Sequence, residues 1–464
     1  MDNNNQQTNN EQVPTIQPQQ TPAIQPATQE LPQNDTAPQQ SNSNVYKWIT
    51  LIVVLILIIG LGLFFIKSNL INNNSQQNKE RSTKALISPT TFVSAQKNFG
   101  FNYLQMLNKL EPNKSIIISP FSIETALAMV YAGSEKETKQ EIAKVMGLSN
   151  PNSEKLNTEI KEILTSLNKS KGATVEIANS FWGAKRIDFN KAYVDTLVNN
   201  YEAKIKSVDF GDPKTKDLIN KWVSDKTHQK IPKIIDETKA GQIIALINAV
   251  YFNGDWQDPF KPTSTKEKDF TNSAGKVIKT QTMVASRNFD YYENDDLQML
   301  TMPYKNQNIK ATILLPKNES ATSFLSDLTE TNWKKWNDNL ANKEGILELP
   351  KFELNYSRDM LDDLKMLGMK KSTIDADFNP MFVKPPTLPV AISKAIHKTF
   401  MRMDEKGTEA AAVTYIGIDV TSMPGGESEK PFEMIVNKPY IIALTDETTD
   451  SMLFLGIIQD PTEK

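Results

Sequence analysis

The 464-residue sequence contains no cysteine and only two histidines, His228 and His397. Without cysteine, the chain has no disulfide, no thiolate metal site, no thiol nucleophile and no cysteine-linked lipid. Two histidines supply little material for a metal site or a catalytic triad. Glycine-rich phosphate loops, a Gly-x-Ser-x-Gly nucleophile motif and repeats of fixed period are also missing. These absences argue against an enzyme, and we expect neither a metal nor a cofactor site.

The net charge of the chain is also small. The chain carries 52 basic and 55 acidic side chains, which gives a formal net charge of −3. Nucleic-acid-binding proteins usually concentrate positive charge on one face, so we expect no nucleic-acid partner. The absence of cysteine leaves the redox compartment open, because a protein without disulfides functions on either side of a membrane.

The first 44 residues lack lysine, arginine and aromatic side chains and are rich in Gln, Asn, Pro and Thr. Such a composition buries too little apolar surface to offset the entropy lost on ordering. We therefore predict that residues 1–44 form a disordered tail. Residues 68–88 are polar and are interpreted as a linker, followed by a globular domain over 89–464.

An apolar run occupies residues 48–66, between Lys47 and Lys67. As a helix, these roughly 19 residues would measure about 29 Å, which matches the hydrocarbon core of a bilayer. Tyr46 and Trp48 suit the headgroup region. A cleaved signal peptide fits poorly, because the run is too long, begins late and has no small-x-small site after it. We predict a transmembrane helix over 45–67.

From Pro89 onward, the apolar spacing alternates between the periods of helix and strand. No fixed repeat interrupts this mixed pattern. The elements that we predict are helices over 91–110 and 122–132, a strand over 116–118, a hairpin over 297–315, and strands over 347–354 and 432–444.

A run of small residues follows Gly407, about fifty residues before the C-terminus. Gly407 supplies a permissive backbone for a hinge. The residues at every second position after it share one face of a strand and are small enough to enter a gap between existing strands. These residues are Thr408, Ala410, Ala412 and Thr414. Taken alone, residues 405–414 fit a helix end or a linker as well as a mobile strand.

Six motifs, in order and at family spacing, resemble those of the serpins. They cover about residues 90–464. The resemblance implies an α+β fold: a single domain with three β-sheets, eight or nine helices and an exposed reactive loop. The motifs are Ser119–Met129, Asn248–Trp256, Tyr304–Pro316, Leu349–Phe352, Lys394–Lys398, and Phe454–Gly456 with Pro461.

The resemblance also implies a function that is not enzymatic. An inhibitory serpin acts as a suicide substrate: a protease attacks the loop and forms an acyl-enzyme, and the cut loop then inserts into the central sheet. Over about 16 residues, insertion would carry the protease on the order of 50 Å. Small hinge residues favour inhibition over the alternative, a non-inhibitory serpin-like binding protein on a surface. The implied hinge is Glu405, Gly407, Thr408, Glu409, Ala410, Ala411 and Ala412.

Family spacing from Glu405 places the reactive bond between Thr421 and Ser422. Because the loop beyond it is about seven residues longer than in compact members, Val420–Thr421 and Ser422–Met423 stay open as alternatives. A small β-branched residue suits a shallow apolar primary pocket, as in elastase-like or subtilisin-like serine proteases, or a cysteine protease. A trypsin-like target is disfavoured, since no basic residue lies between Lys406 and Lys430.

Further positions match family sites one by one. Ser119, Ser122, Asn248 and His397 match the shutter, a hydrogen-bonded cluster where the central strands part. Trp256 and Glu405 match the breach, where insertion begins. The family's cofactor helix corresponds to residues 151–171, where lysines and glutamates mix as on an ordinary solvated face, so we expect no strong polyanion activation.

The remaining expectations concern the setting of the domain. We expect a monomer. The positive charges that follow the apolar run slightly favour a cytoplasmic domain, but long domains translocate largely regardless of such charges. Because family targets are mostly extracellular proteases, we expect a single-pass membrane protein with its serpin-like domain outside the cell.

Overall fold

A six-stranded sheet is the central element of the part of the chain that the computed structural model describes, namely residues 91–149, 151–169, 173–305, 308–387, 389–408 and 430–463. These residues belong to one compact unit, Glu80–Lys464. The predicted tail, transmembrane helix and linker lie outside the described residues. In spatial order, the strands are β10 (Phe352–Asp359), β11 (Ile392–Met403), β12 (Gly407–Thr408), β4 (Ile244–Asp255), β2 (Ala173–Ala184) and β3 (Lys204–Val208).

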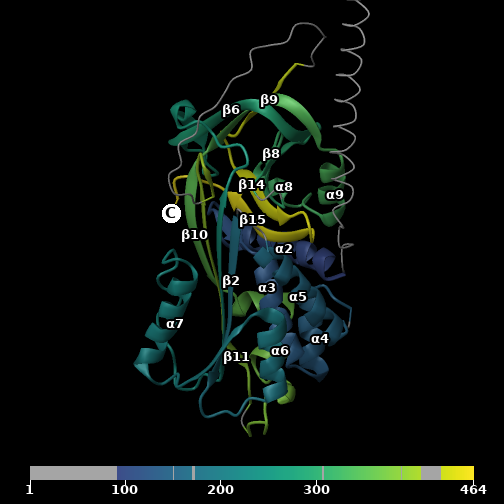
Figure 1. The fold of residues 1–464 in the computed structure, drawn as a ribbon, viewed down its shortest axis with the longest axis vertical. Helices are drawn as coiled ribbons and strands as arrows, with labels where there is room; N and C mark the ends of the chain where they lie inside the picture. Colours follow the sequence, from purple (N-terminus) through teal and green to yellow (C-terminus); the bar gives the residue numbers. More distant parts are fainter. Residues whose placement is uncertain are drawn as a thin grey trace, which may run out of the picture. The chain divides into compact units, whose positions relative to one another are not determined.

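Helices cover both faces of this sheet (Figure 1). α7 (Pro213–Lys226) lies on one face, and α3 (Pro120–Ala132) lies on the other with α6 (Lys191–Tyr201). Neighbouring residues of β2 therefore enter different clusters: Phe181 packs in the larger core, whereas Trp182 packs with Ile219 of α7 in a smaller one. A strand that is buried on both sides has a nearly continuous run of apolar residues, and this explains why β4 is apolar and buried along most of its length.

The second sheet has nine strands, of which the longest is β6 (Val277–Glu293). β6 pairs with β5 and β9 on one stretch and with β7 near its end. The described strands therefore form two hydrogen-bonded sheets rather than the three expected, because β6 joins two groups of strands into one sheet. The other members are β1 (Ile116–Ile118), β5 (Lys266–Thr271), β7 (Leu297–Pro303), β8 (Ile309–Pro316), β9 (Ala341–Pro350), β13 (Phe432–Ile435), β14 (Tyr440–Asp446) and β15 (Ser451–Ile458).

The described residues form nine α-helices, in agreement with the predicted α+β class. The helix over 91–110 and the strand over 116–118 are confirmed. α3 begins two residues before its predicted start, because Ser119 caps it and Pro120 suits the first helical position. The remaining helices are α2 (Thr91–Leu110), α4 (Lys136–Val145), α5 (Ser153–Lys169), α8 (Ala321–Phe324), α9 (Glu330–Asp338) and α10 (Leu361–Leu367).

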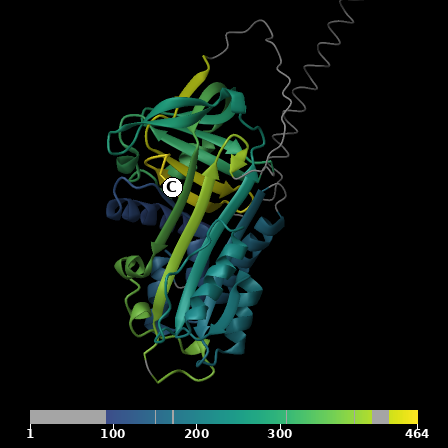
Figure 2. The same cartoon turned by 90° about the vertical axis from the view of Figure 1, so that its left-hand side faces the viewer.

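Two predicted strands are each divided in the structure. The stretch 347–354 contains the end of β9 and the start of β10, which separate at Lys351. The stretch 432–444 contains β13 and β14, separated by a connection that includes Pro439. Pro350 and Pro439 have no backbone N–H, so neither continues a ladder on both sides. The long strands of the central sheet lie side by side in Figure 2.

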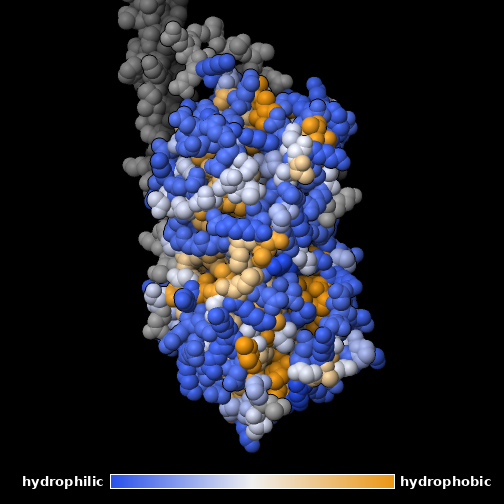
Figure 3. Space-filling model, turned by 180° about the vertical axis from the view of Figure 1, so that it is seen from behind, coloured by the Kyte–Doolittle hydropathy of each residue, from blue (hydrophilic) through white to orange (hydrophobic). Residues whose placement is uncertain are grey.

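None of the helices in the described ranges is long and apolar enough to span a membrane. Seen from behind, the surface is mostly hydrophilic, with hydrophobic side chains reaching it in several patches (Figure 3).

Candidate functional site

One end of the central sheet is parted, and the hinge lies in the gap. β4 and β11 pair directly, in parallel, from Ile244 and Ile392 to Tyr251 and Phe400. Beyond that point β12 lies between them and is antiparallel to both. Thr408 aligns with Met403 of β11 and with Gly254 of β4. Gly407 and Thr408 of the predicted hinge thus already form a strand of the central sheet.

Gly407 is required here by close approach of two backbones. A Cβ at this position would collide with the carbonyl oxygen of Gly254 and would lie 2.8 Å from the Cα of Asp255. The backbone torsion of Gly407 is not in the left-handed region. The sequence-based reason for this glycine, conformational freedom, therefore differs from the reason that the structure gives, which is the absence of a side chain.

The side chain of Thr408 is fully buried and bonded to a tyrosine. Its Oγ1 lies 2.6 Å from the hydroxyl of Tyr304. Tyr304 stacks on the indole of Trp256, with ring centroids 4.4 Å apart and an interplanar angle of 18°. Burial raises the pKa of Tyr304 well above the ordinary value of a phenol, so the hydroxyl stays neutral. Tyr304 thus clamps the first inserted side chain.

Glu405 and Trp256 bind different partners around this gap. The Trp256 Nε1–H donates to the carbonyl of Asp404 over 3.0 Å. Glu405 accepts from Lys351 Nζ at 2.8 Å and from Thr265 Oγ1 at 2.7 Å. Burial alone would raise the pKa of Glu405, but the bonds from Lys351 and Thr265 outweigh it and hold the pKa below its usual value. The carboxylate therefore stays charged where the chain enters the sheet.

A buried polar cluster joins β4 and β11 further along the sheet. His397 and Asn248 are register partners on the two strands, and His397 Nδ1 lies 2.6 Å from Asn248 Oδ1. Ser119 donates its backbone N–H to His397 Nε2 over 3.0 Å. Asn248 Nδ2 donates to Ser122 Oγ and to Ser122 O, the latter over 3.2 Å. The four residues predicted for the shutter therefore meet in one place.

The hydrogen bonds define the protonation of His397. A backbone N–H only donates, so Nε2 must accept from Ser119 and the proton must lie on Nδ1, facing Asn248 Oδ1. Burial lowers the pKa of His397 from 6.5 to about 3, so the ring is neutral. Protonating Nε2 would break the bond to Ser119 and place an uncompensated charge in the core. The cluster is thus held together by a neutral histidine.

Sequence reasoning missed several members of both sites. Asn179 of β2 accepts from Asn248 Nδ2 over 2.6 Å and aligns with it across the sheet. Nothing in the local sequence around Asn179 indicates this contact, which depends on the pairing of β2 with β4. Tyr304 lies in the motif Tyr304–Pro316, and Lys351 lies in the motif Leu349–Phe352, but the sequence assigned neither residue a role. Their partners are distant in sequence, so local patterns do not reveal them.

Residues 94–461 match the family model described as Serpin (serine protease inhibitor). The chain belongs to the serpin family. An uncharacterised serpin-like protein of Methanosarcina acetivorans is 30% identical over 379 residues, which cover 80% of this chain and 86% of that protein. Serpin B4 of Homo sapiens is 30% identical over 392 residues, which cover 79% of this chain and 98% of that protein.

A solved structure agrees with this assignment. The thermophilic serpin tengpin in its native state is similar with a TM-score of 0.72 and 29% identity, over 80% of this chain and 94% of that one. The matched region makes up nearly all of Serpin B4, and in this chain it lies within one compact unit, Glu80–Lys464. The family is described as one of serine protease inhibitors and not of enzymes, which confirms the expectation of a non-enzymatic protein.

The rest of the predicted loop lies outside the described residues. This holds for Glu409, Ala410, Ala411 and Ala412 of the hinge, and for Thr421 and Ser422 with the alternatives Val420 and Met423. Across the described ranges, no group of three or more histidine, aspartate or glutamate side chains could hold a metal ion. In α5, part of the helix that matches the family's cofactor site, Lys155 pairs with Glu159 over 3.8 Å.

Proposed function

We propose that this serpin traps a serine protease as a suicide substrate, by inserting its cleaved reactive loop between β4 and β11. The observation that carries the proposal is the position of Gly407 and Thr408, which already lie between these strands in the uncleaved chain. The burial of Thr408 also defines which hinge side chains would point inward. Residues at even intervals after it would follow the same face, and these are the small residues Ala410, Ala412 and Thr414.

The strand register predicts how far insertion must open the sheet. Each further residue of the loop would move one position back along both β4 and β11. Six positions after Thr408 is Thr414, and six positions before Gly254 and Met403 are Asn248 and His397. Insertion as far as Thr414 would therefore separate the pair that now bonds across the gap. This cluster is the main barrier that the loop must cross.

Cleavage of the reactive bond frees one end of the loop, so that the loop can enter the sheet. From Thr408 to the proposed bond at Thr421–Ser422, thirteen residues of strand would span roughly 43 Å. A protease still esterified to Thr421 would be carried about that distance from its first contact. Distortion of its oxyanion hole then leaves the acyl-enzyme without catalysis of its hydrolysis. The primary residue Thr421 favours proteases with a small apolar pocket, elastase-like or subtilisin-like, and a cysteine protease is a second class to test.

One gel experiment tests the proposal. Residues 80–464 are incubated with elastase, subtilisin, trypsin and papain and separated on denaturing gels. We expect a covalent complex with elastase or subtilisin and none with trypsin. Mass spectrometry of the released C-terminal fragment should show a mass that begins at Ser422. Cleavage of the loop with neither a complex nor a large rise in thermal stability would instead support the non-inhibitory alternative, a serpin-like binding protein.

We also propose that the domain is tethered outside a cell by residues 48–66. The support is the length and flanking residues of this apolar run in the sequence. Alkaline extraction of membranes should leave the full-length chain in the pellet, whereas residues 80–464 should be released. Protease treatment of intact cells should remove the serpin domain. Protection of the domain until the cells are lysed would place it in the cytoplasm.

A further inference from the structure

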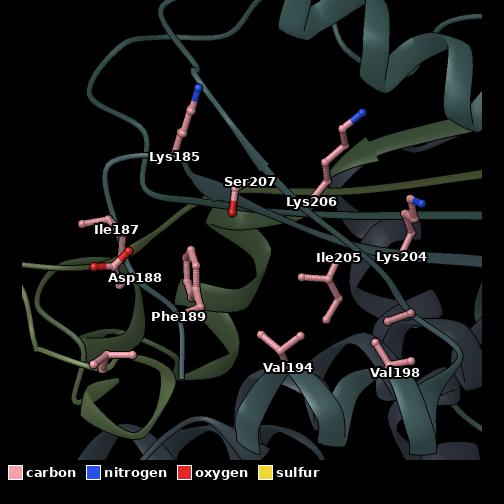
Figure 4. A pocket seen from close by; sticks show the side chains of 12 residues that line it. Lys185, Ile187, Asp188, Phe189, Val194, Val198, Lys204, Ile205, Lys206 and Ser207 are labelled. Carbon is pink, nitrogen blue, oxygen red and sulfur yellow. The ribbon is translucent and has the colours of Figure 1, made fainter. Parts of the chain in front are cut away.

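A groove of about 780 Å³ lies at the edge of the central sheet (Figure 4). Its walls are β3, the helix α6 and the loop that joins β2 to α6, with Val383 from the segment before β11. The residues that line it are not part of the proposed inhibitory machinery. Its volume is in the range of sites that bind small molecules.

The floor of the groove is apolar. Val194 and Val198 of α6 face Ile205 of β3, and Ile187 and Phe189 extend the surface along the loop (Figure 4). Val198 is 50% exposed. When a ligand covers exposed apolar side chains that are gathered in one hollow, their removal from water lowers the free energy of the complex.

Backbone hydrogen bonds hold the walls in place. The Val383 N–H donates to the Asp188 carbonyl over 2.9 Å, and the Asn190 N–H donates to the Met381 carbonyl over 2.8 Å. Phe189 also contacts Phe382, with ring centroids 5.6 Å apart. Two segments that are distant in sequence are thus tied together on this side, so the groove is preformed rather than opened by a ligand.

The rim of the groove is basic. Lys185, Lys204 and Lys206 line it, and within the described part of the chain none of the three has a carboxylate partner. In contrast, Lys191 at the start of α6 pairs with Asp195 over 2.5 Å. Asp188 is the single acidic residue among the lining side chains. The lysines project on the side of the hollow opposite the α6 valines (Figure 4).

We propose that this groove binds a soluble amphiphilic anion of the fatty-acid type, with its hydrocarbon chain on the apolar floor and its carboxylate at the lysine rim. Charge complementarity selects the anion, because the lining carries three lysines against one aspartate. The concave shape selects a single chain in solution over a bilayer, whose flat surface meets protruding rather than recessed apolar groups.

Three matched probes separate the contribution of the apolar floor from that of the lysine charges. Residues 80–464 are titrated in a calorimeter with decanoate, 1-decanol and decyltrimethylammonium, each below its micelle concentration. The three probes share a ten-carbon chain and differ in head-group charge. We expect saturable binding of one decanoate per chain, with the neutral and cationic probes at least about tenfold weaker. Equal binding of all three probes would overturn the proposal.

Variants locate the site. The triple variant Lys185→Gln, Lys204→Gln, Lys206→Gln should weaken decanoate by about tenfold and leave decanol unchanged, since only the charge is removed. The change Val198→Ser should weaken both probes. The double variant Lys214→Gln, Lys226→Gln, on exposed positions of α7, serves as the charge control and should bind as the parent does.

Two further results would contradict the proposal. Unchanged decanoate affinity in the triple variant would mean that the lysines only protect the exposed edge of β3 from pairing with other strands. Sedimentation of the domain with vesicles of anionic phospholipid, without calorimetric binding of decanoate, would assign the groove to a membrane surface instead. All variants change exposed side chains, and their thermal unfolding should match that of the parent. None of these outcomes depends on protease inhibition.

Discussion

The two ends of the β4–β11 contact differ in what holds the strands together. At one end the strands pair directly, and a neutral histidine bonds to an asparagine across the seam. At the other end β12 separates them, and the clamp is made by Tyr304 and Trp256 around Thr408. The sheet is thus already open where the loop enters and closed where the loop would have to pass. Under the proposed mechanism, further insertion would have to separate the shutter cluster, because His397 and Asn248 bond directly across this seam.

The largest expected effect comes from the open end. Thr408→Arg would place a charged side chain in a fully buried position beside Tyr304. We expect covalent complex formation to fall at least about 100-fold, with the loop still cleaved, because insertion is blocked and cleavage is not. The measurement is the ratio of complex to cleaved chain on denaturing gels.

Thr158→Arg is the matched control, since Thr158 is exposed on α5. The control should inhibit as the parent does. If Thr408→Arg formed complexes with parental efficiency, strand insertion through this gap would be ruled out.

The next effect concerns the closed end. Asn248→Ala removes the bonds to His397, Ser122 and Asn179 together and leaves buried polar groups without partners. We expect a loss of roughly 3 kcal/mol in the free energy of unfolding of the native form, read by denaturant titration. Asn288→Ala, at an exposed position, should change it by less than about 0.5 kcal/mol.

The pH dependence sharpens the same contrast, because the folded-state pKa of His397 is lowered from 6.5 to about 3. Protonation favours the unfolded chain, so the stability contributed by the neutral ring is complete above pH 6.5 and is lost as the pH falls toward 3. By pH 5 the loss is about 2 kcal/mol. His397→Gln should remove this part of the pH dependence, whereas His228→Gln, which replaces the other histidine, should retain it. Parallel pH profiles for the two variants would contradict the assignment.

The smallest effect is expected from Tyr304→Phe, which deletes one hydroxyl from the clamp. We expect a loss of about 1 kcal/mol in stability, together with a change in the fluorescence of Trp256, on which the ring stacks. Tyr440 offers a control, because its buried hydroxyl lacks a hydrogen-bond partner among the described residues. Tyr440→Phe should therefore be neutral or stabilising, and an equal loss in both variants would remove the special role of Thr408.

Patterns along the chain predicted the fold class. The helix over 91–110 and the strand over 116–118 have strong local signals, apolar periodicity in one and a short β-branched run in the other. Divided strands were missed because the interruptions at Lys351 and before Pro439 follow from where each half finds a partner. Asn179 was missed for the same reason, since its role depends on the register of β2 against β4.

The sequence by itself determined the family, the small residues after Gly407 and four residues of the shutter cluster, Ser119, Ser122, Asn248 and His397, because these are matters of residue type and spacing. Only the tertiary structure decided that Thr408 is already inserted, that Tyr304 holds it and that His397 carries its proton on Nδ1. Each of these depends on distances between groups that are about 100 or more residues apart, as with Tyr304 and Thr408. Local sequence patterns do not predict such distances, since these hydrogen bonds and this burial arise only when the strands pair.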